Sequence, residues 1–209
     1  MLVWWITVLA ILIFSAILHE IAHGWMALKF GDPTAKLAGR LTLNPIPHID
    51  PLMSLLLPAA LILMGSPFIL GGAKPVPIDP SRFFSYRKGM FWVSFAGVAT
   101  NFLLAIVFGL ILRLLLLFSV GELATSLLAL MVFINLILGL FNLIPIPPLD
   151  GSKLLGTILN LSPHQQQNFD RLGMFGLLIV IILLPFLSPI ISFAINGLFF
   201  LLTGAAFHF

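Results

Sequence analysis

The chain alternates between long apolar runs and short connections that are rich in polar residues and proline. Residues 2–30 form the first apolar run, which as a helix would measure about 42 Å at 1.5 Å per residue. Two further runs cover residues 89–118 and 123–144. Because the hydrocarbon core of a bilayer is about 30 Å thick, each of these runs is long enough to cross it. The pattern therefore predicts transmembrane helices over all three.

Proline interrupts two other apolar runs. Residues 52–70 contain Pro58, so this run is a poor straight span that we expect to be membrane-embedded. It is either re-entrant, or it spans the membrane and the Pro-rich segment after it returns across the bilayer. Residues 172–207 contain Pro185 and Pro189, so they form either a hairpin of two short spans or one kinked helix. Together the apolar runs predict a helical bundle with about four to six transmembrane segments.

The connections at 41–51 and 71–88 are also rich in proline. Proline disrupts regular helix and favours extended or turn structure, so we expect a small membrane-associated extended or β segment here. Ser162 followed by Pro163 predicts the N-cap and first residue of a short helix. The predicted fold class is an all-α polytopic membrane protein, in which residues 1–209 form a single membrane-embedded domain.

The composition supports a membrane location and limits the possible partners. The chain is 60% hydrophobic and 8% charged, with a mean hydropathy of +1.17, whereas a soluble domain carries roughly a quarter charged residues. The lipid bilayer is therefore the solvent for most side chains. The absence of cysteine excludes disulfides and thiolate metal sites. The net charge of +3 comes from scattered basic residues that form no stripe, which argues against a nucleic-acid partner.

The charges of the connections predict the orientation in the membrane. Residues 29–40 and 71–88 carry most of the basic side chains, whereas the turn at 119–122 carries only Glu122. Basic connections usually lie on the cytoplasmic side. We therefore expect an N-terminus outside, a first helix that runs inward, and a span ending at residue 144 that also runs inward.

Residues 19–23 read HEIAH, in the middle of the first apolar run. His19 and His23 are one helical turn apart, so their imidazoles project from one face and can bind the same metal ion. Neutral imidazole suits Zn²⁺, and Glu20 is placed to act as a base toward a metal-bound water. Placing three such side chains in a spanning helix costs free energy on the order of several kcal/mol, unless they are paired or coordinate a metal. A catalytic zinc site still needs a third protein ligand.

Asp150 is the favoured third ligand. It follows a stretch with three prolines that must unwind the preceding helix, and Gly151 beside it allows close backbone approach. It also lies on the same side of the membrane as HEIAH in the expected topology. The alternative is that Asp150 caps the helix that begins at Gly151. The remaining acidic and histidine candidates are interpreted as ordinary surface groups: His48, Asp50, Asp79, His164, Asp170 and His208.

These motifs carry a resemblance to a known family. HEIAH matches HExxH, FNLIPIPPLDG at 141–151 matches N-x-x-P-x-x-x-x-D-G, and AGVATN at 96–101 is a weaker match to A-G-P-x-x-N. On these residues the chain resembles the site-2 protease family of intramembrane zinc metalloproteases. Val98 stands where that family usually has proline. The turn at 119–122 has no room for a PDZ-like insert and no CBS-like domain follows the last span, so the chain is similar to the short forms of the family.

The resemblance implies one catalytic Zn²⁺ held by His19, His23 and Asp150, with Glu20 as general base. It also implies that Asn101 and Asn142 hold the substrate backbone or the oxyanion. A multi-pass protein of the bacterial cell membrane, with its active site toward the cytoplasm, is expected.

The predicted function is intramembrane endopeptidase, with transmembrane proteins as substrates. Either Pro-rich segment, 41–51 or 72–80, could supply a strand edge for an unwound substrate. Two alternatives from other classes are a membrane protein that binds or transports zinc and an inactive scaffold that binds membrane helices. Zinc transport would require further ligands along the membrane, and the sequence shows one cluster.

Overall fold

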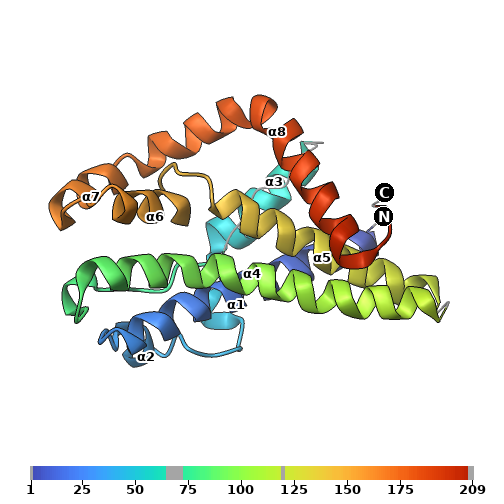
Figure 1. Ribbon diagram of the computed structural model, residues 1–209, viewed down its shortest axis with the longest axis horizontal. Coiled ribbons are helices and arrows are strands. Elements are labelled where there is room, and N and C mark those ends of the chain that lie inside the picture. The colour runs from blue at the N-terminus through green and yellow to red at the C-terminus, as the bar shows by residue number, and fades with distance from the viewer. Residues whose placement is uncertain (1, 65–72, 119–120, 207–209) are drawn as a thin grey trace. The chain divides into compact units, whose positions relative to one another are not determined.

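The computed structural model describes residues 2–64, 73–118 and 121–206 (Figure 1). The chain divides into two compact units, Met1–Gly97 and Val98–Phe209. Helix α4 (Tyr86–Leu117) contributes its first residues to one unit and the rest to the other.

The first unit is organised around helix α1 (Leu2–Lys29). This helix ends where the sequence predicts, because Gly31 adopts a φ of +105° and the Asp32 N–H donates to the carbonyl oxygen of Ala27 at 2.9 Å. A small core joins α1 to the beginning of α4 through Ala27, Phe83, Met90 and Val93. The unit's remaining elements are short: α2 (Thr34–Leu37), η1 (Ile46–His48), η2 (Pro51–Leu56), α3 (Leu57–Leu63) and η3 (Pro80–Arg82).

The predicted β segment is not seen, because no strand forms in the part of the chain that the structure describes. Ile46–His48, inside the first Pro-rich connection, is a 3₁₀ helix. Residues 73–79, inside the second, have neither helical nor strand structure. Proline explains this outcome, since it removes the N–H groups that a β ladder requires.

The interrupted run at 52–70 forms a π-helical turn of six residues, Pro51–Leu56, which continues as the seven-residue helix α3. A helix of that combined length measures about 20 Å, which is shorter than a bilayer core. This agrees with the expectation of a poor straight span. The return path that a re-entrant segment needs falls on residues 65–72, outside the described residues.

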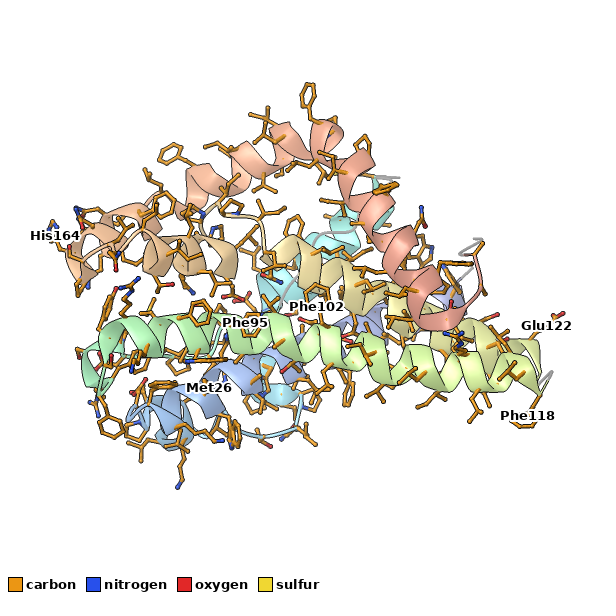
Figure 2. All side chains as sticks on the ribbon, viewed as in Figure 1. Met26, Phe95, Phe102, Phe118, Glu122 and His164 are labelled. Carbon is orange, nitrogen blue, oxygen red and sulfur yellow. The ribbon has the colours of Figure 1, made fainter. Side chains whose placement is uncertain are left out.

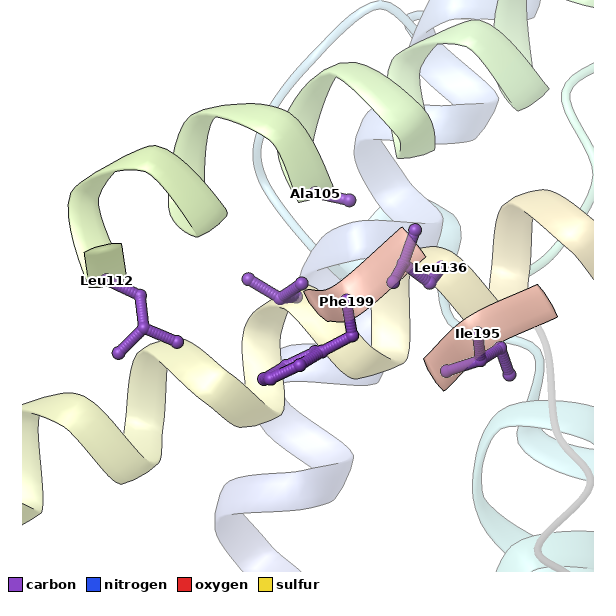
Figure 3. Close-up of a cluster of buried hydrophobic side chains, with 6 residues drawn as sticks. Ala105, Leu112, Leu136, Ile195 and Phe199 are labelled. Carbon is purple, nitrogen blue, oxygen red and sulfur yellow. The ribbon is translucent and has the colours of Figure 1, made fainter. Parts of the chain in front are cut away.

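The second unit contains the end of α4 and helices α5 (Glu122–Asn142), α6 (Asp150–Ile158), α7 (Pro163–Asp170) and α8 (Gly173–Thr203). Figure 2 labels Phe118, the residue after the end of α4, and Glu122, the first residue of α5. Helices α4, α5 and α8 share an apolar core (Figure 3), formed by Ala105, Leu112, Val132, Leu136, Ile195 and Phe199. Ser162 begins α7 with a reciprocal capping box to Gln165, so the predicted N-cap is confirmed.

Of the two possibilities for residues 172–207, a hairpin or one kinked helix, the structure has one helix. Helix α8 is continuous, with Pro185 and Pro189 inside it. The ribbon bends midway along this helix (Figure 1). Proline at 189 removes the N–H that would bond the Pro185 carbonyl, and the hydroxyl of Ser188 donates to that carbonyl at 3.2 Å.

Four helices in the described residues are long and apolar enough to cross a membrane, which lies within the predicted number of spans. These candidate spans are Val3–Lys29, Tyr86–Leu117, Glu122–Asn142 and Leu178–Thr203. The polytopic helical class is therefore confirmed.

Candidate active site

His19 and His23 meet side by side on helix α1, as their spacing predicts. Their Nε2 atoms are 2.9 Å apart and their ring centroids are 4.5 Å apart. Both side chains are buried, with exposed fractions of 7% and 6%. Two buried imidazole nitrogens that converge on one point form a donor pair suited to a shared Zn²⁺ ion.

The orientation of His23 is fixed from helix α4. The Nδ1 atom of His23 lies 2.7 Å from the carbonyl oxygen of Val93. A carbonyl can only accept, so Nδ1 carries the proton and donates it, which leaves the Nε2 lone pair for a metal. Such a second bond behind a histidine ligand is the usual way in which proteins orient metal-binding imidazoles. The sequence held no signal for Val93, because any residue can offer its carbonyl.

Gly97 provides the space that the paired imidazoles occupy. A Cβ atom added to Gly97 would lie 2.6 Å from Nε2 of His19 and would also collide with Nε2 of His23. Real Cβ atoms do not approach other atoms this closely. Sequence reasoning noticed Gly97 only as a letter in AGVATN, and its steric role becomes visible in the structure.

Glu20 is held by the backbone of a segment far away in the sequence. Its Oε2 atom accepts a hydrogen bond of 2.7 Å from the Val76 N–H. Glu20 is partly buried. The bond fixes one oxygen of the Glu20 carboxylate, and Glu20 follows His19 directly on α1. Sequence reasoning missed Val76, although its position between Pro75 and Pro77 leaves it the only N–H donor of those three residues.

Asp150 lies at the beginning of helix α6 in the second unit. The residue at the N-cap position is Leu149, and no side-chain hydrogen bond caps the helix. The alternative role of Asp150 as an N-cap is therefore wrong. Its Oδ1 atom lies 3.8 Å from Nζ of Lys153, one turn along the same helix. Asp150 as the third zinc ligand stays a prediction.

The backbone at the start of α6 lies against the residues that follow α5. Helix α5 ends at Asn142, before the three prolines, so the predicted unwinding is confirmed. A Cβ atom on Gly151 would lie 2.5 Å from the carbonyl oxygen of Ile144. The backbone at the start of α6 therefore touches the backbone that leaves α5, and Gly151 permits the close approach that the sequence suggested.

Both asparagines predicted to bind substrate have hydrogen bonds within the second unit. Asn101 is completely buried, and its Nδ2 atom donates to Oδ1 of Asn135 at 3.1 Å. Asn142 donates from Nδ2 to the carbonyl oxygen of Leu138 at 2.9 Å. Asn135 was not singled out in the sequence. The substrate-binding role of Asn101 and Asn142 stays a prediction.

Two of the residues set aside as surface groups have structural roles in the first unit. His48 is 1% exposed, so the expectation that it faces solvent was wrong. Asp79 is at the N-cap of η3. The hydrogen bond from the Ser81 hydroxyl, and next that from Arg82, lowers the pKa of Asp79 below its ordinary value. His164 and Asp170 are exposed residues of α7, and His208 is outside the described residues.

Comparisons with known proteins bear directly on this histidine and carboxylate chemistry. The model of peptidase family M50 matches residues 117–184, which include Asp150. The chain is also similar to YwhC of Bacillus subtilis, with 34% identity over 190 residues that cover 88% of this chain and 81% of that protein. The chain belongs to peptidase family M50. No solved structure matches it.

A second relative of this M50 peptidase is Rip2 of Mycolicibacterium smegmatis. It is 35% identical over 206 residues, which cover 98% of this chain and 74% of that protein. YwhC and Rip2 are both named as candidate zinc metalloproteases. The M50 chain is a zinc metalloendopeptidase, and the four long apolar helices found in its described residues make it a multi-pass membrane protein.

Proposed function

We propose that this M50 peptidase is an intramembrane endopeptidase that cuts peptide bonds within or near the transmembrane helices of other proteins. The observation that carries the proposal is the placement of His19, Glu20 and His23 inside α1, a helix apolar enough to span a membrane. Ionisable residues are costly in a spanning helix, so a base and a metal-binding pair there support action on a substrate that is itself in the membrane.

His19, His23 and Asp150 would hold one Zn²⁺ ion, with both units, residues 1–209, acting as one protease domain. Two imidazoles and one carboxylate form a catalytic donor set that keeps a fourth position open for water. When bound, zinc lowers the pKa of that water to about 7 and draws electron density from the scissile carbonyl. The burial of all three side chains, with Asp150 6% exposed, supports them as ligands.

Glu20 would serve as the general base and then as the acid. Its carboxylate accepts the proton that the attacking water loses as the new carbon–oxygen bond forms. It returns that proton to the nitrogen of the departing amine when the carbon–nitrogen bond breaks. His23 keeps its orientation through both steps because its Nδ1–H stays hydrogen-bonded to the Val93 carbonyl.

The position of Trp25 and Lys29 supports a site near one membrane surface. Nζ of Lys29 lies 3.7 Å from the ring centroid of Trp25, a pairing that suits the boundary between lipid and water. Along the helix axis, His23 lies about 3 Å before Trp25, and His19 lies about 9 Å before Trp25. The basic connections on this side favour the cytoplasmic face of a bacterial cell membrane.

A transmembrane substrate must unwind locally, because a helix keeps its amides in internal hydrogen bonds. Asn101 and Asn142 are proposed to hold the unwound backbone. The suggestion that 72–80 supplies a strand edge loses support, because Pro75 and Pro77 lack the N–H groups of such an edge. The 3₁₀ helix Ile46–His48 likewise interrupts the alternative edge at 41–51.

The test is cleavage of a membrane-anchored substrate by the full chain in proteoliposomes. Glu20→Gln should abolish cleavage with zinc still bound, whereas His19→Ala should lose both zinc and cleavage. His164→Ala, which changes an exposed histidine of α7, is the matched control and should behave as wild type. Undiminished cleavage by Glu20→Gln would refute the proposal. Zinc flux lost in His19→Ala but kept in Glu20→Gln would favour transport instead.

A further inference from the structure

Residues 73–79 form an extended segment, here called the strap, that crosses the first unit without regular secondary structure. Three of its N–H groups have identified acceptors. The Lys74 N–H donates to the His48 carbonyl at 2.7 Å, and the Val76 N–H donates to Glu20 Oε2 at 2.7 Å. At the far end, the Asp79 N–H donates to Oδ2 of the fully buried Asp32 at 2.7 Å.

The alternation of proline along the strap makes its bonding one-sided. In an extended chain, successive N–H groups point to opposite edges. Lys74 and Val76 therefore share one edge, which faces His48 and Glu20. Pro75 and Pro77 fall on the other edge and have no N–H. All the amide donors of residues 74–77 are thus directed to the side where Glu20 lies.

Arg40 fastens the strap next to the Val76 amide. Its side chain is 7% exposed, and its Nη2 atom donates to the Lys74 carbonyl at 2.5 Å. Lys74 is therefore bonded through both its N–H and its carbonyl, two residues before Val76. A buried guanidinium is costly, so its use on a backbone carbonyl indicates that the position of this segment matters.

The Val76 side chain packs against α1 and so sets the distance between the strap and this helix. Val76 is 6% exposed. A Cβ atom on Gly24 would lie 3.0 Å from Cγ1 of Val76 and 2.7 Å from Cδ2 of Leu41. Gly24 directly follows His23, so the strap packs closely onto α1 beside the metal-binding pair.

We infer that the strap is a positioning device for the catalytic base, in which the Val76 N–H aims the Glu20 carboxylate and Arg40 holds that N–H in place. The bond on Oε2 fixes the rotation of the carboxylate and leaves Oε1 to receive the proton from water. This inference rests on the proposed role of Glu20. Val76 and Arg40 act through Glu20 and are positioning residues.

The experiment uses the full chain in proteoliposomes with a membrane-anchored substrate, and measures kcat, KM and bound zinc for each variant. Arg40→Ala should lower kcat about 10-fold or more, because small misplacements of a reacting group have effects of this size. KM and zinc content should stay unchanged, and Arg40→Lys should recover part of the rate. Hydrogen exchange should be faster at 73–79 in Arg40→Ala, which reports the loosened strap without reference to activity.

Val76→Pro tests the N–H itself and should lower kcat as Arg40→Ala does. Val76→Ala keeps the N–H and should retain most of the rate. Lys36→Ala, an exposed cation of α2, is the control for charge and should leave kcat unchanged. Arg40→Ala carries the test if proline at position 76 prevents folding.

An unchanged kcat in Arg40→Ala with faster exchange at 73–79 would overturn the inference. Loss of zinc together with rate would overturn it too, because the strap would then support the metal-binding pair and not the base. Cleavage by Glu20→Gln at the wild-type rate would refute the proposed function itself. The two failures are therefore distinguishable.

Discussion

Gly97 of α4 lies directly against the imidazole of His19, so close that a Cβ atom would come within 2.6 Å of Nε2. The two residues are far apart in the sequence, and the hydrogen of glycine is the only side chain that leaves room between them. Helix α4 therefore shapes the metal-binding pair twice, through this gap and through the Val93 carbonyl that bonds His23.

Gly97→Ala should weaken zinc binding about 10-fold or more, because the added methyl displaces both imidazoles from their shared focus. Zinc affinity measured by competition with a chelator checks this. Gly197→Ala is the matched control, since a Cβ on that helical glycine meets nothing within 4 Å. Equal zinc affinities in the two variants would contradict the steric role of Gly97.

Gly151→Ala should displace the start of α6, because the new Cβ would meet the backbone carbonyl of Ile144 at 2.5 Å. A backbone carbonyl cannot rotate away as a side chain can. We expect the variant to lose both zinc and cleavage while its helical content by circular dichroism stays near that of wild type. Full zinc occupancy in Gly151→Ala would argue against Asp150 as a ligand.

Variants of the hydrogen-bonded pair Asn101 and Asn135 can distinguish a structural role of Asn101 from a role in binding substrate. Asn135→Ala removes the acceptor of the buried Asn101 amide, so it should destabilise the protein by about 1–3 kcal/mol with little change in KM. If Asn101 also holds substrate, Asn101→Ala should be similarly destabilised and should in addition raise KM. Thermal unfolding in detergent and steady-state kinetics provide the two measurements. Identical kinetics in both variants would confine Asn101 to a structural role.

Ser162→Ala should loosen α7 by removing the capping box with Gln165, at a cost of about 1 kcal/mol. Hydrogen exchange at 163–170 should become faster, while exchange in α5 should not change. Gln167→Ala, an exposed change in the same helix, controls for loss of a polar side chain. Slower or unaltered exchange in Ser162→Ala would show that the cap does not limit opening of this helix.

Local patterns predicted the long apolar helices and the convergence of His19 and His23. The first helix was expected over 2–30 and is Leu2–Lys29. This prediction succeeded because the length of the apolar run and the glycine after it are both local signals. His19 and His23 meet because one helical turn separates them. The same reasoning could not decide between one helix and two at 172–207, since proline either breaks or bends a helix depending on what packs against it.

Partners that are distant in the sequence could not be predicted. Val93 serves the site through its carbonyl, Gly97 through its missing side chain and Val76 through its N–H. Every residue has a carbonyl, every residue except proline has an N–H, and any glycine lacks a side chain, so residue type alone does not mark these positions. The expectation of a β segment failed for a related reason. Extended backbone was expected at both proline-rich connections, but the prolines that favour it also remove the donors of a ladder.

The bend in α8 has a consequence for where that helix can lie. Proline 189 frees the carbonyl of Pro185, and an unpaired carbonyl is expensive in hydrocarbon. Ser188 supplies the missing donor from within the same turn. At this carbonyl the helix therefore needs neither water nor a neighbouring helix as a hydrogen-bond donor, so this turn of α8 can remain bent while it faces lipid tails directly.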